Sequence, residues 1–184
     1  MKIVLGISGS SGAIYATRTI HCLKEAGHSL ELTASPNALQ IGLDEMSTDY
    51  TSLDVPFFGQ KDFSAPFASG SAVTAHYDAM VIIPCSMGTL GRIAHGYSDS
   101  LLTRAADVFL KEKKTLILVP RETPFNLVHI ENMRLLALAG AEIIPAIPSF
   151  YSKPKTIEEA VDTVIARVLD HLGVGNDLRP RYGN

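Results

Sequence analysis

The sequence contains no tryptophan, only two cysteines and little net charge, and these shortages exclude several classes of protein. The formal net charge of -3 gives no reason to expect nucleic acid or an anionic membrane as a partner. Cys22 and Cys85 stand far apart and lack CxxC or Cys/His spacing, which argues against a disulfide scaffold or a zinc site. No run approaches the ~18 consecutive apolar residues that indicate a membrane-spanning helix.

The beginning of the sequence also lacks the features of a secretory signal. Met1–Gly6 reaches a glycine before a long apolar stretch forms, so we expect a cytoplasmic protein. Hydrophobic residues make up 46% of the 184 residues and charged residues 19%, which is enough apolar material for a sizeable core. We therefore expect a single domain over residues 1–184, with a C-terminal tail over residues 172–184.

Short apolar runs alternate with segments of helical spacing along the chain. Lys2–Ile7 is typical of a buried parallel strand, and Ala13–Ala26 repeats apolar residues with the period of a helix. This alternation, with right-handed crossovers, predicts an α/β fold with a Rossmann-like, doubly wound parallel sheet. Further strands are expected at Ser29–Ala34, Ala79–Pro84, Thr115–Val119 and Glu142–Ile147, and further helices at Asn37–Met46, Thr89–His95, Leu101–Lys111, Asn126–Ala139 and Ile157–His171.

The segment Tyr50–Ala75 interrupts the alternation. It mixes prolines and glycines with phenylalanines and shows no sustained period. Its four phenylalanines suit packing against a surface, so we predict a long excursion that serves a function or forms an interface. These phenylalanines are Phe57, Phe58, Phe63 and Phe67.

Hydroxyl-bearing and small residues follow the predicted strands, at the edge where an open α/β sheet binds its ligands. They are joined by one arginine and one carboxylate, a chemistry that suits a phosphorylated ligand. The segments concerned are Ser8–Gly12, Ser35, Cys85–Thr89, Pro120–Thr123 and Pro148–Tyr151.

The first of these loops places glycines at GxxGxxG spacing between a strand and a helix. Glycine lets backbone N–H groups approach a phosphate, and the helix N-terminus adds a favourable dipole. The spacing differs from the GxGxxG dinucleotide fingerprint, and the second strand ends in Ala34-Ser35 instead of an acidic residue. A monophosphate such as FMN therefore fits better than NAD, and a tight turn without a ligand is the alternative interpretation.

Other catalytic patterns are weak or missing. The sequence has neither the G-x-S-x-G elbow of hydrolases nor a Walker A motif. Cys85 lacks a local partner that would activate it as a nucleophile, so we interpret it as a small apolar residue at a strand end.

Six separated motifs resemble, in the correct order, those of the UbiX-type flavin prenyltransferases. The resemblance extends from the first strand to the start of the last helix. The motifs are Gly6–Tyr15, Ser69–Ser71, Pro84–Leu90, Leu101–Val108, Val119–Pro124 and Pro145–Tyr151.

The resemblance implies a role for particular residues. FMN would be contacted by Gly9, Ser10, Ser11, Ser35, Ser86, Met87, Gly88, Thr89 and Arg121. Dimethylallyl phosphate would be held by Tyr151 and Arg167, and Glu122, Arg104 and Lys111 would surround the reacting centre as catalytic residues. We hypothesise that Glu122 handles protons, because it stands beside Arg121 at a strand end.

The resemblance also implies a reaction and partners. Family members transfer a five-carbon allyl group to reduced FMN and close a fourth ring, which gives prenylated FMN for a UbiD-type decarboxylase. They commonly assemble as homododecamers with flavin sites between subunits, so residues far apart in one chain are expected to meet across an interface. No metal is expected, because the cations already neutralise the phosphate.

Two departures and two alternatives accompany this interpretation. Ser10 replaces the usual alanine, and Gly88 stands where some relatives have lysine. An FMN-dependent cysteine-peptide decarboxylase would carry a P-x-M-N-x-x-M-W segment, but the chain has no tryptophan. A non-catalytic FMN-binding subunit of a decarboxylase complex would lack the cationic set found here. The sequence does not discriminate between a monophosphate and a pyrophosphate donor.

Overall fold

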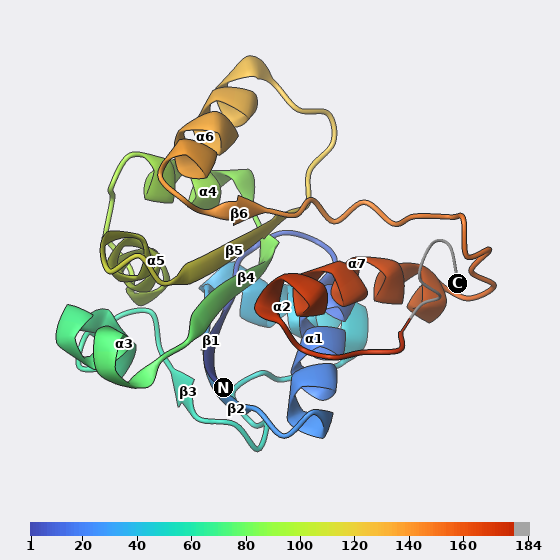
Figure 1. Cartoon of the computed structure of the whole chain (residues 1–184), viewed down its shortest axis with the longest axis horizontal. Coiled ribbons are helices and arrows are strands. Elements are labelled where there is room, and N and C mark those ends of the chain that lie inside the picture. The colour runs from blue at the N-terminus through green and yellow to red at the C-terminus, as the bar shows by residue number, and fades with distance from the viewer. Residues whose placement is uncertain (179–184) are drawn as a thin grey trace.

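The computed structural model describes residues 1–178 and contains one parallel sheet (Figure 1). Within this range the strand order is β3-β2-β1-β4-β5-β6, and every neighbouring pair is parallel. This confirms the predicted α/β, doubly wound class. The strands are β1 (Lys2–Ile7), β2 (Ser29–Ala34), β3 (Phe57–Phe58), β4 (Ala79–Cys85), β5 (Thr115–Pro120) and β6 (Glu142–Ile143).

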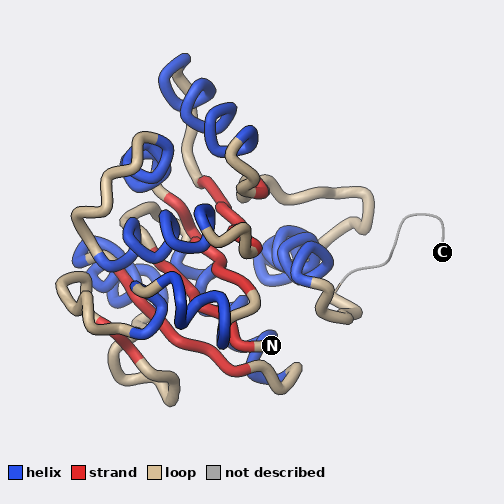
Figure 2. The backbone as a smooth tube through the Cα atoms, turned by 60° about the vertical axis from the view of Figure 1, so that its left-hand side comes forward, coloured by secondary structure: helices blue, strands red, loops and turns tan. Residues whose placement is uncertain are grey.

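Helices cover both faces of the sheet, as Figures 1 and 2 show. The α-helices are α1 (Ala13–Glu25), α2 (Pro36–Met46), α3 (Gly70–His76), α4 (Met87–Ala94), α5 (Leu101–Lys111), α6 (Leu127–Leu138) and α7 (Ile157–Leu172), and η1 (Pro66–Ala68) is a short 3-10 helix. Their starts follow local chemistry, because serine, asparagine or threonine side chains cap the N-termini of α2, α4, α5, α6 and α7.

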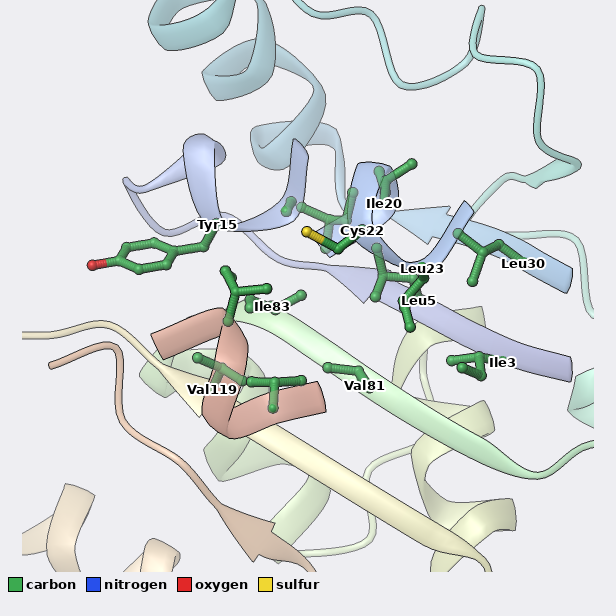
Figure 3. Packing of buried hydrophobic residues seen from close by; sticks show 14 of the residues in the cluster. Ile3, Leu5, Tyr15, Ile20, Cys22, Leu23, Leu30, Val81, Ile83 and Val119 are labelled. Atoms are coloured by element: carbon green, nitrogen blue, oxygen red, sulfur yellow. The ribbon is translucent and has the colours of Figure 1, made fainter. Parts of the chain in front are cut away.

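Alternate residues of the strands enter two apolar layers, one on each face of the sheet. Ile3 and Leu5 of β1 pack in the layer shared with α1 and α7, whereas Val4 packs in the layer shared with α4 and α5. Figure 3 shows the first layer, in which Ile20 and Leu23 of α1 lie over the sheet. The sheet is therefore buried on both faces, which explains why its central strands read as continuous apolar runs.

The segment Tyr50–Ala75 is more ordered than predicted, because it contains β3, η1 and most of α3. Phe67 is fully buried and packs edge-to-face against Phe58 at 5.2 Å and Tyr77 at 6.2 Å between ring centroids. Phe63 remains exposed. Part of this segment thus completes the chain's own core, and its helix is too short to show a period; a role in function or at an interface stays a prediction.

The last strand is shorter than predicted. Regular pairing ends at Ile143, although the N–H groups of Ile144 and Ala146 still donate to the carbonyls of β5 residues Leu118 and Pro120, both at 2.9 Å. Pro145 lies between these two donors on the edge strand, where its missing N–H costs no bond to β5. The following residues, 144–156, form an extended segment that we call the arm; it runs along the outside to α7 (Figure 1).

The end of the chain was predicted as a tail over residues 172–184. Leu172 still belongs to α7 and Val174 is buried, whereas residues 179–184 lie outside the described residues. Over residues 1–178, no helix is long and apolar enough to cross a membrane.

Candidate active site

Three loops at the carboxyl ends of the strands are joined by serine hydroxyls. Ser8, after β1, donates to the carbonyl oxygen of Pro84 at 3.1 Å and accepts the N–H of Ser86 at 2.6 Å. Ser10 donates to the carbonyl oxygen of Arg121, after β5, at 2.7 Å. Because β1 lies at the point where the strand order reverses, these bonds build a rigid floor at the position where such sheets bind ligands.

The Arg121 side chain folds over the first loop. Its Nε donates to the carbonyl oxygen of Ser11 at 2.9 Å and lies 3.3 Å from the Ser10 hydroxyl. Gly12 has a φ of +106°, a left-handed conformation that favours glycine, and it turns the chain into α1. The predicted group Ser10, Ser11 and Arg121 is therefore brought together.

Glu45, at the C-terminal end of α2, is a site residue that the sequence did not indicate. One carboxylate oxygen accepts the N–H groups of Gly12 and Ala13, each at 2.8 Å. Burial raises the pKa of Glu45, but hydrogen bonds from Ser11, Ala13 and Gly12 and the charge of Arg121 outweigh burial and lower it. The exposed carboxylate of Glu45 thus caps the N-terminus of α1, and the expectation that this terminus receives a phosphate stays a prediction.

A cavity of about 280 Å³ lies where the N-termini of α2, α4 and α5 converge. Each of these termini is capped by a serine side chain, from Ser35, Ser86 and Ser100. Together they direct backbone N–H groups and the positive ends of three helix dipoles toward one place. The lining residues are Ser35, Pro36, Gln60, Lys61, Thr89, Arg92, Asp99, Ser100, Leu102 and Thr103.

This cavity fits the phosphate end of FMN, because hydroxyls, helix N-termini and two cations surround it; the Asp99 carboxylate, 3.6 Å from Arg92 Nε, neutralises part of this positive charge. The sequence indicated Ser35 and Thr89 but missed Ser100, Arg92 and Lys61. Ser100 carries a signal, since a serine three residues before Thr103 is a helix-capping pattern. Arg92 and Lys61 carry no such local signal.

Two predicted FMN contacts need refinement. The Met87 side chain is buried in the core, so this residue faces the loops through its backbone. Gly88 is exposed, and a Cβ atom there would meet only Arg92 Nη1 within 4 Å, at 3.6 Å. Arg92 also donates to the carbonyl oxygen of Gly88 at 3.2 Å. A cation therefore lies beside position 88 although the lysine of some relatives is missing.

A second cavity, of about 500 Å³, lies between the arm and α7. It brings together Tyr151 and Arg167, the two residues predicted to bind the phosphate donor. Apolar side chains form much of the rest of its wall. The lining residues are Ile144, Pro145, Ile147, Ser149, Tyr151, Thr163, Val164 and Arg167.

Glu122 and Cys85 also lie at the strand ends but in different surroundings. Glu122 is exposed, and its carboxylate accepts the N–H of Thr123 at 3.0 Å. Cys85 is fully buried, and burial raises the pKa of its thiol to about 12. A thiolate is therefore scarce near neutral pH, in agreement with the interpretation of Cys85 as a packing residue.

Arg104 and Lys111 lie elsewhere in the subunit. Arg104 Nε donates to the carbonyl oxygen of Ala68 at 3.1 Å, and Lys111 pairs with Glu112 beside Gly70. Their contacts are with Ala68 of η1 and Gly70 of α3, and α5 lies on the opposite face of the sheet from α7 (Figure 1). We call these residues, with Ser69 and Ser71, the α5 cluster. Neither predicted catalytic cation lines the two cavities of its own chain.

The side chains that commonly bind metals are not clustered within residues 1–178. Among residues 1–178, no group of three or more His, Cys, Asp or Glu side chains could hold a metal ion. Cys22 and Cys85 are both free.

The fold and the strand-end site define a flavoprotein: the Flavoprotein family model matches residues 1–169. The chain is 44% identical to the flavin prenyltransferase UbiX of Methanocaldococcus jannaschii, over 100% of this chain and 99% of that protein. It therefore belongs to the Flavoprotein family and, within it, to the UbiX-type flavin prenyltransferases.

Solved structures agree with this assignment. A UbiX crystal structure in complex with FMN and dimethylallyl pyrophosphate has a TM-score of 0.94 and 33% identity, covering 100% of this chain and 97% of that chain. A dodecameric FMN-dependent UbiX-like decarboxylase from Escherichia coli O157:H7 has a TM-score of 0.92 and 37% identity, with 100% of both chains covered.

Proposed function

We propose that this protein transfers a dimethylallyl group from dimethylallyl phosphate to reduced FMN and so produces prenylated FMN. The observation that carries the proposal is the pair of cavities at the strand ends. One gathers three helix N-termini, and the other places a tyrosine and an arginine together against apolar walls. The relatives named flavin prenyltransferase support the same activity.

The FMN phosphate is assigned to the cavity at the N-termini of α2, α4 and α5. Backbone N–H groups, the hydroxyls of Thr89 and Thr103, and the cations Lys61 and Arg92 suit a dianionic group. The bonds of Glu45 to two N–H groups of the α1 terminus support this assignment over one at α1. From this cavity the flavin would extend across the Gly9–Ser11 loop toward Arg121, so that all predicted cofactor residues lie along one path.

The donor phosphate is assigned to Tyr151 and Arg167. Breaking its C–O bond leaves additional negative charge on phosphate, which a guanidinium stabilises through paired, charge-assisted hydrogen bonds. The buried side chain of Val164 and the half-buried side chain of Ile144 would shield the allyl group from water. These residues bind and orient the donor and limit its hydrolysis.

Reduced FMN supplies the electron-rich ring atoms that accept the allyl group. The protein then has to manage protons, because ring closure removes one from the aromatic carbon of the flavin while the double bond of the allyl group takes one up. We assign this proton transfer to the carboxylate of Glu122, which takes the ring proton or passes a proton to the departing phosphate. Its position beside Arg121, on the loop after β5, supports the assignment.

Assembly into a homo-oligomer, with the homododecamer as the expected form, would bring the α5 cluster of one subunit to the strand-end site of another. Arg104 and Lys111 would then reach the reacting centre as catalytic residues. The exposed apolar face of α6 supports assembly, since Leu127 is 70% exposed and Leu138 73% exposed. The solved E. coli relative is dodecameric.

The assembly can be tested with Leu138→Glu, which places a charge on the exposed apolar face of α6. We expect this variant to sediment as smaller species, with Leu43→Glu on α2 as the control. A wild-type sedimentation profile for Leu138→Glu would remove α6 from the proposed contact.

Two further parts complete the proposal. The product would be consumed by a UbiD-type decarboxylase, and the protein would act in the cytoplasm.

A non-catalytic flavin-binding subunit is the second candidate, because a single subunit separates Arg104 and Lys111 from the two cavities. Activity therefore depends on the assembly.

The decisive experiment is anaerobic incubation with reduced FMN and dimethylallyl monophosphate, followed by mass analysis of the extracted flavin. A parallel incubation uses the pyrophosphate. We expect a mass gain of one C5 unit with at least one donor. Bound but unmodified FMN with both donors would overturn the transferase and favour the flavin-binding subunit.

A further inference from the structure

We propose that Thr163 is a positioning residue for the transfer reaction: its hydroxyl fixes the arm so that Tyr151 and Arg167 face the same phosphate. This inference rests on the proposed function, because it concerns the donor cavity. It adds a residue whose hydroxyl is engaged by two backbone groups of the protein.

The hydroxyl of Thr163 makes two short hydrogen bonds. It accepts the backbone N–H of Ser149, in the arm, at 3.0 Å and donates to the carbonyl oxygen of Ala160 at 2.7 Å. The residue is 3% exposed, so water does not replace these bonds easily. The bond to Ala160 orients the oxygen, and the bond from Ser149 fastens the arm to it.

The position of Thr163 on α7 explains why this bond matters for the donor. Residues four apart lie on the same face of a helix, so Arg167 projects on the same side as Thr163. Ser149 is two residues before Tyr151 in the arm. The single hydroxyl therefore links the backbone that carries Tyr151 to the helix turn that precedes Arg167, and all four residues line one cavity.

The arm needs such a fastening because it has little regular structure. Its pairing with β5 ends at Ala146, and the N–H of Lys155 donates to the Glu159 carboxylate of α7 at 2.6 Å. Between these positions Pro148 and Pro154 have no N–H, and Phe150 is 69% exposed. The Ser149–Thr163 bond ties the arm to α7 in this interval.

The helix is itself held in place. Arg18 of α1 pairs with Asp162, the neighbour of Thr163, through two hydrogen bonds of 2.7 and 2.9 Å. This bidentate pair connects α7 to the helix that follows the Gly9–Ser11 loop. Because α7 is fixed to α1, the Thr163 hydroxyl also fixes the arm relative to the Gly9–Ser11 loop.

The test compares Thr163→Val, which keeps the shape but removes the hydroxyl, with Thr163→Ser, which retains it. Thr19→Val is the matched control, because Thr19 is a fully buried threonine on α1 whose hydroxyl bonds only within its own helix, to the Tyr15 carbonyl. Each protein is used as the assembled, FMN-loaded form. The measurements are KM and kcat for dimethylallyl monophosphate, the Kd for FMN, and hydrogen exchange of the 148–152 segment without donor.

We expect Thr163→Val to raise KM about 5- to 10-fold, as for loss of one buried hydrogen bond, with the Kd for FMN unchanged. Exchange at the Ser149 amide should accelerate. Thr163→Ser should restore both properties, and Thr19→Val should change neither.

Three results would overturn the inference: an unchanged KM in Thr163→Val, an equal defect in Thr163→Ser, or a parallel loss of FMN affinity that indicates general damage. If Thr163→Val does not assemble, Ser149→Pro removes the same bond from the arm's side, and an unchanged KM there also overturns it. A wild-type protein that binds FMN but transfers no C5 unit instead refutes the proposed function.

Discussion

The two cavities at the strand ends differ in how their walls are held. The cofactor cavity is formed by the first turns of three capped helices, each anchored in the core through its apolar face. The donor cavity depends on the arm, whose Ile147 and Phe150 are each 69% exposed. The cofactor cavity is thus preformed, whereas the donor cavity has one wall of irregular backbone. Flavin binding and donor binding should therefore respond to different substitutions.

The largest expected effect is on the rate of transfer, with binding in both cavities unchanged. Replacing Glu122 by glutamine should slow transfer by about 100-fold or more, the usual loss when a general acid–base is removed. The affinities for FMN and donor should stay unchanged, since Glu122 lines neither cavity. Single-turnover kinetics with extracted-flavin mass analysis measures the rate. Glu131→Gln on α6 is the exposed control, and full turnover in Glu122→Gln would refute the proton role.

A substitution in the donor cavity should weaken donor binding and leave FMN binding unchanged. Arg167→Met removes the guanidinium, and loss of a charged hydrogen-bond partner predicts a donor affinity lower by roughly 10- to 100-fold. FMN affinity should remain that of the wild type, as measured by flavin fluorescence. Arg167→Lys should recover part of the donor affinity, and Arg134→Gln on α6 is the unrelated control. Equal weakening of FMN and donor binding would show that the pockets are not independent.

A substitution at Gly9 should weaken FMN binding and leave donor binding unchanged. A Cβ atom at this position would lie 2.6 Å from the Asn37 Cβ atom of α2, so Gly9→Ala forces the first loop away from that helix. Overpacking of this kind predicts FMN affinity weaker by about tenfold. Gly59→Ala is the matched control, because a Cβ atom there meets nothing within 4 Å. Unchanged FMN affinity in Gly9→Ala, measured by titration, would contradict the assigned path of the flavin.

The smallest effect concerns the pH dependence of stability around the first loop. The folded-state pKa of Glu45 lies below its ordinary value of 4.5, so its carboxylate stabilises the fold above that pH. This contribution, about 0.5 kcal/mol after allowance for solvent screening, is lost as pH falls through the folded-state pKa. Urea unfolding of the wild type between pH 3 and 7 should show it. Glu45→Gln should lack this step, and an identical pH profile would contradict it.

Much of the fold could be predicted because its signals are local. Strand β1 reads as an apolar run, and the glycines and serines after it mark the turn that begins the site. Glu45 could not be found in this way, since it meets Gly12 and Ala13 only after α2 has packed against α1. Arg92 likewise looks like a solvated helix residue until three helix termini converge near it.

In the donor site, too, the sequence indicated some residues and missed another. Family motifs indicated Tyr151 and Arg167, and the structure brings them to one cavity. Thr163 escaped notice because a threonine within an apolar helix has the appearance of a packing residue. Its role depends on the path of the arm, which the sequence suggested would continue as a strand to Ile147.

The carboxylate of Glu45 also has a consequence for molecular discrimination. Proteins that bind dinucleotides offer the N-terminus of the first helix to a pyrophosphate. Here the two N–H groups at that terminus are satisfied from within the chain, and a pyrophosphate approaching in the usual orientation would meet a like charge. We therefore expect the fold to disfavour a dinucleotide at this terminus, although it keeps the strand order of nucleotide-binding proteins.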